Sequence, residues 1–432
     1  MSENWYESLT DAELNNEIAH LEERAAQIAA QNLKLDMARG KPSREQLDLS
    51  RPMLDVLGAD ADLFDGSIDC ANYGCFEGIP SARALFAELL GTQAQNVFMG
   101  GESSLTLEFD TLEHAMVKGV MGNTPLMYQM QKAPLKWICL VPGYDRHFAI
   151  TQHFGFELIP APLTGCGPDM DIVEELVKDP QVKGMWCVPQ YSNPSGETYS
   201  SEVVERIANL KPAAADFRVY WDNAYCEHHL YEDDREHVDS IFDACEKADN
   251  PHLVYAFCST SKMTFPGAGV SALAASKENL ADLAQSNTNR LIGHDKLNQL
   301  RHARFFGDVE GLRAHMNKHA AVLRPRFDAV NRKLEQELGS LGVASWTHPK
   351  GGYFVSFTGM PGSAKATVSM AKELGITLTG AGSTWPYGED PQNSNIRIAP
   401  TMPTLSNLEQ ALDVFTVCVK LVSARLVRDA RR

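Results

Sequence analysis

The sequence lacks several features that would indicate a membrane or nucleic-acid protein. It has no stretch of about 18 uninterrupted apolar residues, so no transmembrane helix is expected. The N-terminus shows no basic flank followed by an apolar core, and a signal peptide is therefore not predicted. A formal charge of −17 argues against nucleic acid or an anionic membrane as a partner. The nine cysteines include no Cys-x-x-Cys pair, which favours reduced thiols in a cytoplasmic protein.

What the chain does contain is enough apolar sequence for two domains. It has 432 residues, of which 44% are hydrophobic. From about residue 70 to 310, short Val/Ile-rich runs alternate with helical patterns, which predicts a parallel sheet covered on both faces. Capping boxes at Thr10–Glu13 and Ser406–Glu409 predict an early and a closing helix. We also predict a long helix from Arg313 to Gly339 and a strand at Gly352–Phe357.

Chemically active side chains follow three of the predicted buried strands. Lys262 comes after the apolar run 253–258, Asp222 and Tyr225 follow the run that starts at Val219, and Asn193 follows 185–188. Open α/β sheets bind ligands at the carboxyl ends of their strands. We therefore expect an amine, a carboxylate, a phenol and an amide to converge on one small molecule.

The order and spacing of these residues resembles the fold-type I aminotransferases that use pyridoxal 5'-phosphate. The resemblance implies that Lys262 is the Schiff-base lysine and that Asp222 keeps the pyridine nitrogen of the cofactor protonated. It further implies that Asn193 and Tyr225 hydrogen-bond the ring hydroxyl. The implied fold is α/β, with a large domain around a mostly parallel seven-stranded sheet and a smaller α/β domain. We expect the large cofactor domain at residues 61–315, with 1–60 and 316–432 in the small domain.

More cofactor contacts are implied by the same resemblance. Tyr144 matches the aromatic residue that stacks on the ring, and His147 matches a histidine that supports the aspartate from behind. A phosphate favours a helix N-terminus with hydroxyl groups, and this predicts a site at Gly101, Ser103 and Ser104, joined by Ser259. A glycine turn with a serine N-cap explains the first three residues equally well locally.

One position departs from the family pattern. Most members carry an arginine eight residues after the lysine, and it pairs with the phosphate. This chain has Val270 there, and no arginine occurs between Lys262 and Arg290. The phosphate is therefore expected to depend on hydroxyls, backbone amides and a cation from elsewhere.

Substrate contacts are implied at both ends of the chain. Arg397 matches the arginine that binds the α-carboxylate, for which a guanidinium is the natural bidentate partner. Gly40 matches a glycine that lets the backbone approach the substrate. Tyr73 matches a tyrosine that reaches the phosphate of the neighbouring subunit, which implies a homodimer with shared active sites. No metal site is predicted.

Two longer segments resemble a narrower group. Residues 292–302 and 384–391 are similar to the bacterial subgroup Ic, MocR-like aspartate aminotransferases. The resemblance implies ping-pong transfer of the amino group from L-aspartate to 2-oxoglutarate. The second carboxylate of such a substrate needs a cation, for which Arg290 and Lys296 are rival candidates. A charge on a helix surface is an equally good interpretation of either residue.

Other functions on the same fold stay open. The amino-acid specificity could be for alanine or an aromatic residue, and a lyase or decarboxylase that uses the same cofactor is an alternative. A MocR-type regulator needs a basic DNA-binding module of about 70 residues. Only some forty residues precede the Arg39–Pro42 turn here, and acidic residues are prominent among them. This disfavours the regulator.

Overall fold

Seven strands form the central sheet, in the order β4-β10-β9-β8-β7-β5-β6. Only β10 is antiparallel to its neighbours, whereas the other adjacent pairs are parallel. The computed structural model, which describes residues 4–432, thus confirms the predicted mostly parallel seven-stranded sheet. The strands are β4 (Val97–Met99), β5 (Lys136–Val141), β6 (Glu157–Pro162), β7 (Val182–Cys187), β8 (Arg218–Asp222), β9 (Val254–Ser259) and β10 (Ser271–Ala274).

Apolar side chains on both faces of this sheet explain why it is buried. Along β5, Ile138 and Leu140 belong to one apolar cluster, while Trp137 and Cys139 belong to the cluster on the opposite face. This alternation follows from the two-residue repeat of a strand. Helices that contribute to the first cluster are α4 (Pro80–Leu90), α8 (Met170–Leu176), α9 (Ser201–Ala208), α10 (Ile241–Lys247) and α12 (Lys296–Phe306). Those on the other face are α5 (Ser104–Val117), α6 (Leu126–Gln129), α7 (Asp145–His153) and α11 (Lys277–Arg290).

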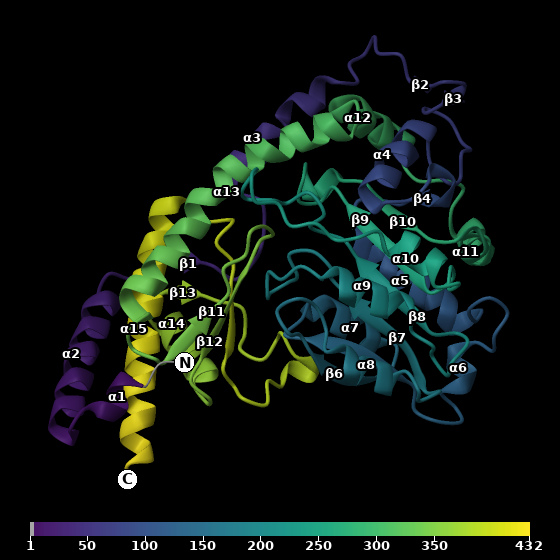
Figure 1. Cartoon of the computed structure of the whole chain (residues 1–432). Helices are drawn as coiled ribbons and strands as arrows, with labels where there is room; N and C mark the ends of the chain where they lie inside the picture. Colours follow the sequence, from purple (N-terminus) through teal and green to yellow (C-terminus); the bar gives the residue numbers. More distant parts are fainter. Residues whose placement is uncertain (1–3) are drawn as a thin grey trace.

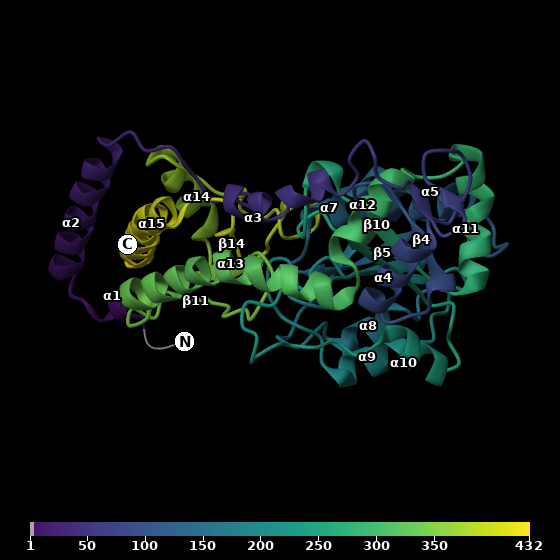
Figure 2. The ribbon, with the colours of Figure 1, turned by 90° about the horizontal axis from the view of Figure 1, so that it is seen from above.

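A smaller unit combines the two ends of the chain (Figure 1). Its antiparallel sheet has the order β11-β12-β14, and β1 from the N-terminal segment pairs with β13. Helix α2 packs against α15, and both views show the two side by side (Figure 2). The elements are α1 (Trp5–Ser8), α2 (Asp11–Ala29), β1 (Leu35–Asp36), α3 (Arg44–Leu49), β11 (Ala344–Trp346), β12 (Val355–Gly359), α14 (Ala364–Glu373), β13 (Ile376–Thr377), β14 (Asn395–Ile398) and α15 (Leu405–Ala430).

Two predicted element starts in the small unit differ from the structure. The capping box at Thr10–Glu13 is present at the start of α2, but the one at Ser406–Glu409 is wrong. The cap of α15 is Thr404, whose hydroxyl accepts from the Asn407 N–H at 3.3 Å. Strand β12 starts at Val355, three residues later than predicted, because Gly352 has a φ of 78° and turns the chain.

The long helix α13 (Val309–Leu338) runs from the large unit into the small one (Figure 1). It begins before Arg313 because Asp308 caps it. Its apolar residues up to Met316 pack with the sheet, and those from Leu323 onward pack in the small unit. On this basis we propose domain boundaries near residues 60 and 315. The remaining short elements are η1 (Arg51–Asp55), β2 (Phe64–Asp65), β3 (Ile68–Asp69), η2 (Ala94–Asn96), η3 (Pro266–Ala268) and η4 (Pro386–Gly388).

Among residues 4–432, no helix has the length and apolar character that crossing a membrane requires.

Candidate active site

The predicted site residues lie at the carboxyl ends of three adjacent strands. Strands β7, β8 and β9 neighbour one another, and they lead into the segments of Asn193, Asp222 and Lys262. The Lys262 Nζ lies 4.8 Å from the centroid of the Tyr225 ring. The structure therefore brings the amine and the phenol together, as expected at this edge of a parallel sheet.

Asp222, the last residue of β8, is only 3% exposed. Its Oδ2 lies 3.2 Å from Nε2 of His147, so the structure brings these two side chains into contact as the sequence suggested. Its Oδ1 is buried and has no hydrogen-bond partner among the described residues. A buried carboxylate oxygen without a partner costs free energy, which favours a donor from a bound molecule at this point.

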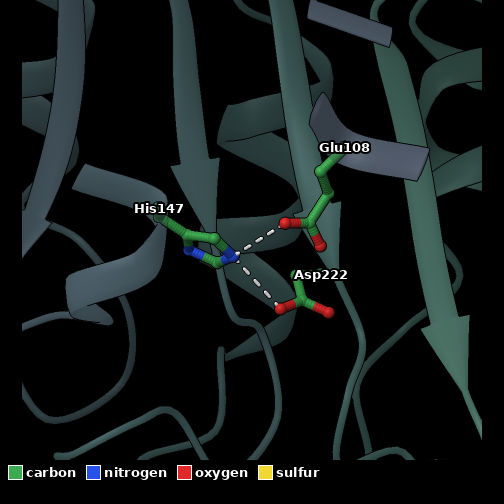
Figure 3. Close-up of side chains that lie close together, drawn as sticks. All are labelled: Glu108, His147 and Asp222. Carbon is green, nitrogen blue, oxygen red and sulfur yellow. Dashed lines mark hydrogen bonds and ion pairs between the residues drawn. The ribbon is translucent and has the colours of Figure 1, made fainter. Parts of the chain in front are cut away.

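Glu108 completes this cluster, and the sequence analysis missed it. Its Oε2 lies 3.4 Å from the same Nε2 of His147, and Figure 3 shows the imidazole facing both carboxylates. Glu108 is one turn beyond Ser104 on α5, and the two therefore share a helix face. The available signal was a charged residue between the apolar Leu107 and Leu112 on a helix that covers the sheet.

The buried cluster has shifted pKa values. Burial lowers the pKa of His147, but the charge and close contact of Glu108 and the hydrogen bond to Asp222 outweigh this and raise it to about 9. Burial and the charge of Asp222 raise the pKa of Glu108, although His147 opposes this. Two acids and one base therefore compete for protons at one buried point.

Two tyrosines near Lys262 are protonated donors. Burial raises the pKa of Tyr225 far above its ordinary value, and the charge of Asp222 adds to this effect. Burial likewise raises the pKa of Tyr144, which precedes α7. Both phenols therefore keep their protons at neutral pH and can donate hydrogen bonds.

The N-terminus of α5 provides an anion-binding end. Ser103 is its N-cap residue but makes no side-chain capping bond, and Ser104 is buried. The Ser259 hydroxyl donates to Oγ of Ser261 at 3.1 Å. The free N–H groups of the first helical turn and the Ser103 hydroxyl can donate hydrogen bonds to a phosphate.

The glycine that packing requires here is Gly100. A Cβ on Gly100 would lie 2.5 Å from Oγ of Ser271, whereas the nearest atom to a Cβ on Gly101 would be 3.7 Å away.

At the position of the missing arginine, Val270 is buried and its N–H donates to Oγ1 of Thr260 at 3.0 Å. This position therefore offers no cation.

Arg397 reaches the site from β14 of the small unit. It is 8% exposed, and its Nη1 donates to Oδ1 of Asn193 at 3.2 Å and to Oδ1 of Asp145 at 3.1 Å. Its guanidinium carbon lies 4.9 Å from the centroid of the Phe354 ring. A Cβ on Gly40 would lie 2.4 Å from the same ring. Gly40 therefore leaves room for the ring that supports Arg397.

Arg290, Lys296 and Tyr73 were also candidates for the site, but their contacts within the chain are with other residues. Arg290 Nη2 pairs with Oδ2 of Asp110 at 2.8 Å, and Asp110 lies on a different face of α5 from Glu108. The Lys296 ammonium donates to the carbonyl oxygens of Asn72 and Gly74. Between these two carbonyl groups, Tyr73 is 84% exposed.

Comparison with known proteins identifies relatives of this chain. The family model described as aspartate amino-transferase matches residues 9–430. An aspartate aminotransferase from Corynebacterium glutamicum is 48% identical over 399 residues, which is 92% of this chain and 91% of that protein. A crystal structure of an aspartate transaminase from C. glutamicum superposes with a TM-score of 0.95 at 44% identity, covering 99% of this chain and 100% of that one.

A more distant structure shares the fold alone. It is an α-aminoadipate aminotransferase from Thermus thermophilus, with a TM-score of 0.72 and 20% identity, covering 92% of this chain and 95% of that one. That structure is a complex with N-(5'-phosphopyridoxyl)-L-leucine. The family match over most of the chain and the 48% identity to a curated relative lead to one conclusion. This chain belongs to the aspartate aminotransferase family, an enzyme family with the fold-type I architecture.

Proposed function

We propose that this enzyme transfers the amino group of L-aspartate to 2-oxoglutarate by a ping-pong mechanism, with pyridoxal 5'-phosphate bound at Lys262. The observation that carries the proposal is the convergence of Lys262, Asp222 and Arg397 on one buried site. Aminotransferases of this family generally use that cofactor. The name of the C. glutamicum relative supports aspartate as the amino donor.

The donor set of the site fits the cofactor. Asp222 Oδ1, buried and without a partner among the described residues, provides the acceptor that a protonated pyridine nitrogen needs. The N-terminus of α5 with Ser103 and Ser104 suits the phosphate, and we propose Gly101 and Ser259 as further members of this phosphate site. Tyr144 provides an aromatic face for the ring.

When bound, the pyridine ring of the cofactor accepts the electron pair released at the α-carbon of the substrate. Lys262 Nζ would hold the cofactor covalently between turnovers. Once the amino group of the substrate displaced it, the free amine would take the proton from the α-carbon and deliver it to the cofactor carbon to which the substrate nitrogen is bound. Asn193 accepts from Arg397 through Oδ1, which leaves its Nδ2 group to donate to the ring hydroxyl. The Tyr225 phenol, which keeps its proton, is the second donor to that hydroxyl.

Arg397 binds the α-carboxylate of every substrate. Its Nε is buried without a partner among the described residues, so a carboxylate would satisfy a group that the protein alone leaves unpaired. Phe354 beneath the guanidinium restricts its orientation. Gly40 supports this geometry by leaving space for the ring.

For the second carboxylate of aspartate, we favour Arg290 over Lys296. The Lys296 ammonium already binds two backbone carbonyl groups, whereas the Arg290 side chain is 38% exposed and has one carboxylate partner.

We further assign the chain to the MocR-like subgroup Ic on its segments 292–302 and 384–391. The second segment contacts the loop of Tyr144, since the carbonyl of Thr384 accepts from the N–H of Gly143 at 2.8 Å.

We also infer that the enzyme is a homodimer with shared active sites. Tyr73 and Ile292 are 84% and 62% exposed and line one surface cavity of about 410 Å³. Large exposed apolar side chains of this kind mark an interaction surface.

The nine cysteines are all free thiols, including Cys226 and Cys258 with sulfur atoms 3.7 Å apart, which favours the reducing cytoplasm.

A substrate panel on the purified enzyme tests the function. Aspartate and glutamate should be preferred over alanine and phenylalanine, and aspartate with 2-oxoglutarate should yield oxaloacetate and glutamate. Release of alanine from aspartate would indicate β-decarboxylation and contradict transamination. Equal rates for all four amino acids would remove the dicarboxylate specificity and leave an aminotransferase of another preference.

A further inference from the structure

Glu108 is a buried ionisable group for which the proposed function has no use. It is 0% exposed, and neither of its carboxylate oxygens has a well-formed hydrogen bond among the described residues. A carboxylate that is fully removed from water must be neutralised or paired with a cation. The partner within reach is Nε2 of His147, 3.4 Å from Oε2 (Figure 3).

The His147 ring is held so that one nitrogen faces two acids. It stacks on Trp186 of β7, with ring centroids 4.5 Å apart and planes inclined by 9°. In this orientation Nε2 lies 3.4 Å from Glu108 Oε2 and 3.2 Å from Asp222 Oδ2. A neutral imidazole with its proton on Nδ1 would place a nitrogen lone pair against two carboxylates. A proton on Nε2 turns both contacts into favourable ones.

We propose that Glu108 is a positioning residue that keeps a proton on Nε2 of His147, so that Asp222 presents a charged Oδ1 to the ring nitrogen of the cofactor. The part that concerns the cofactor rests on the proposed function, whereas the protonation of His147 does not. Glu108, His147 and Asp222 come from α5, α7 and β8, and the arrangement exists only in the folded chain.

Charge balance explains why a second acid is useful. Two carboxylates and one imidazolium leave the cluster with one negative charge, which a protonated ring nitrogen neutralises. If Glu108 were absent, His147 would lose an anionic partner and release its proton more readily, so Oδ2 of Asp222 would lose the charged donor that holds this carboxylate with Oδ1 toward the ring N–H. Among residues 4–432, the other titratable groups that face the cluster are Lys262, Tyr144, Tyr220 and Tyr225, and the three phenols keep their protons.

The titration of this cluster has a defined sign. The pKa of His147 is raised from 6.5 to about 9, so its contribution to stability is complete below pH 6.5 and is lost as the pH rises through about 9. The pKa of Glu108 is raised from 4.5 to about 7, so its contribution to stability is complete below pH 4.5 and is lost as the pH rises through about 7. The stability of the cofactor-free enzyme should therefore decrease between pH 6.5 and about 9.

The first experiment uses Glu108→Gln, which keeps the side-chain shape and removes the charge. Histidine-selective ¹³C NMR of the cofactor-free enzyme, with the His147 signal assigned from His147→Asn, should show its pKa lower by about one unit or more than in the parent. Glu197→Gln is a matched control, because burial raises the pKa of Glu197 to about 7 as well. Glu197 accepts from the Gly167 N–H at 2.8 Å, and its replacement should leave His147 unchanged.

The second experiment measures cofactor binding. Glu108→Gln should weaken the binding of pyridoxal phosphate about tenfold, the factor that corresponds to one pKa unit. An analogue with carbon in place of the ring nitrogen cannot use the charge of Asp222, and its affinity should not change. Glu108→Asp, which keeps the charge, should recover part of the affinity for pyridoxal phosphate.

Several results would overturn the proposal. An unchanged His147 titration in Glu108→Gln is one, and equal weakening of both cofactor analogues is another, since it would mark Glu108 as purely structural. The donor atoms of the three residues also lie within 4.8 Å of one another, a spacing that suits a metal ion. Stoichiometric metal in the parent enzyme that is lost in Glu108→Gln would therefore replace the proton by a cation. The NMR result is independent of any transaminase activity, so failure of the proposed function is seen separately.

Discussion

At Arg397 and Asp222, part of each side chain is hydrogen-bonded within the chain, and one polar atom is buried without a partner among residues 4–432. The bound atoms hold the side chains in place, whereas the unpaired Nε and Oδ1 are available to a ligand. Leaving a buried polar group unpaired costs about 1–3 kcal/mol, so such atoms mark places where binding is rewarded.

Lys262→Ala tests the site at this scale. Because its amine moves the proton at the α-carbon, kcat for aspartate should fall by roughly 10²–10⁴-fold or more. The visible absorbance of covalently held cofactor should disappear from the purified protein. Steady-state kinetics and an absorption spectrum check both results. Lys178→Ala, an exposed lysine paired only with Glu175, is the control and should behave like the parent. Parental turnover in Lys262→Ala contradicts the role assigned to the amine.

At the scale of elements, α5 brings several functions to one helix. Its N-terminus offers N–H groups for the phosphate, and one turn later the same face carries Glu108 toward Asp222. A different face carries Asp110, which pairs with Arg290 at the end of α11. Helix α12 begins a few residues further on, where Lys296 holds the backbone around Tyr73. The two rival cations thus have different surroundings.

Replacing each rival cation by leucine separates their roles. Arg290→Leu should lower kcat/KM for aspartate. The corresponding loss of transition-state stabilisation should be about 2–5 kcal/mol, the cost of leaving a carboxylate without its partner. Its activity toward alanine should barely change, because alanine has no charged side chain. Lys296→Leu should instead lower thermal stability and affect all amino acids alike. Kinetics with both substrates and thermal melts give the answer, and a loss confined to aspartate in Lys296→Leu would reverse the assignment.

At the scale of the whole molecule, the site lies between the two units of the chain. The large unit provides Lys262, Asp222 and Asn193, and the small unit provides Arg397. The Tyr353 hydroxyl from the small unit donates to the carbonyl oxygen of Lys262 at 3.2 Å. The relative position of the units therefore determines the distance between Lys262, to which we assign the cofactor, and Arg397, to which we assign the substrate carboxylate.

Subunit mixing tests the proposed dimer. Tyr73→Ala and Lys262→Ala should each have low activity, and sedimentation should give a mass of two chains. After the two variants are unfolded together and refolded, about a quarter of the parental activity should return, because half of the dimers are mixed and each has one complete site. Mixtures of Lys262→Ala with parental chains calibrate the refolding yield. No recovery, with mixed dimers present, would show that Tyr73 does not serve the partner's site.

Much of the candidate site was predictable from the sequence. Buried strands have a local pattern, and the polar residues that follow Val188, Trp221 and Cys258 are read directly from the chain. Since parallel strands place their carboxyl ends on one edge, their convergence follows from topology. The alternating apolar runs likewise predicted a sheet covered on both faces.

Other features depended on contacts between segments far apart in the sequence. Nothing near Glu108 in the chain indicates that it meets His147, and nothing near Gly40 indicates that Phe354 fills the space above it. The partners of Arg290 and Lys296 were also open, because a helix-surface charge has no local signature for what it contacts. Element ends such as Thr404 were decided by backbone geometry. The sequence alone thus determined which chemical groups lie at the strand ends, since this depends on local periodicity. Only the tertiary structure decided which buried charges face each other, since this depends on how α5, α7 and β8 pack.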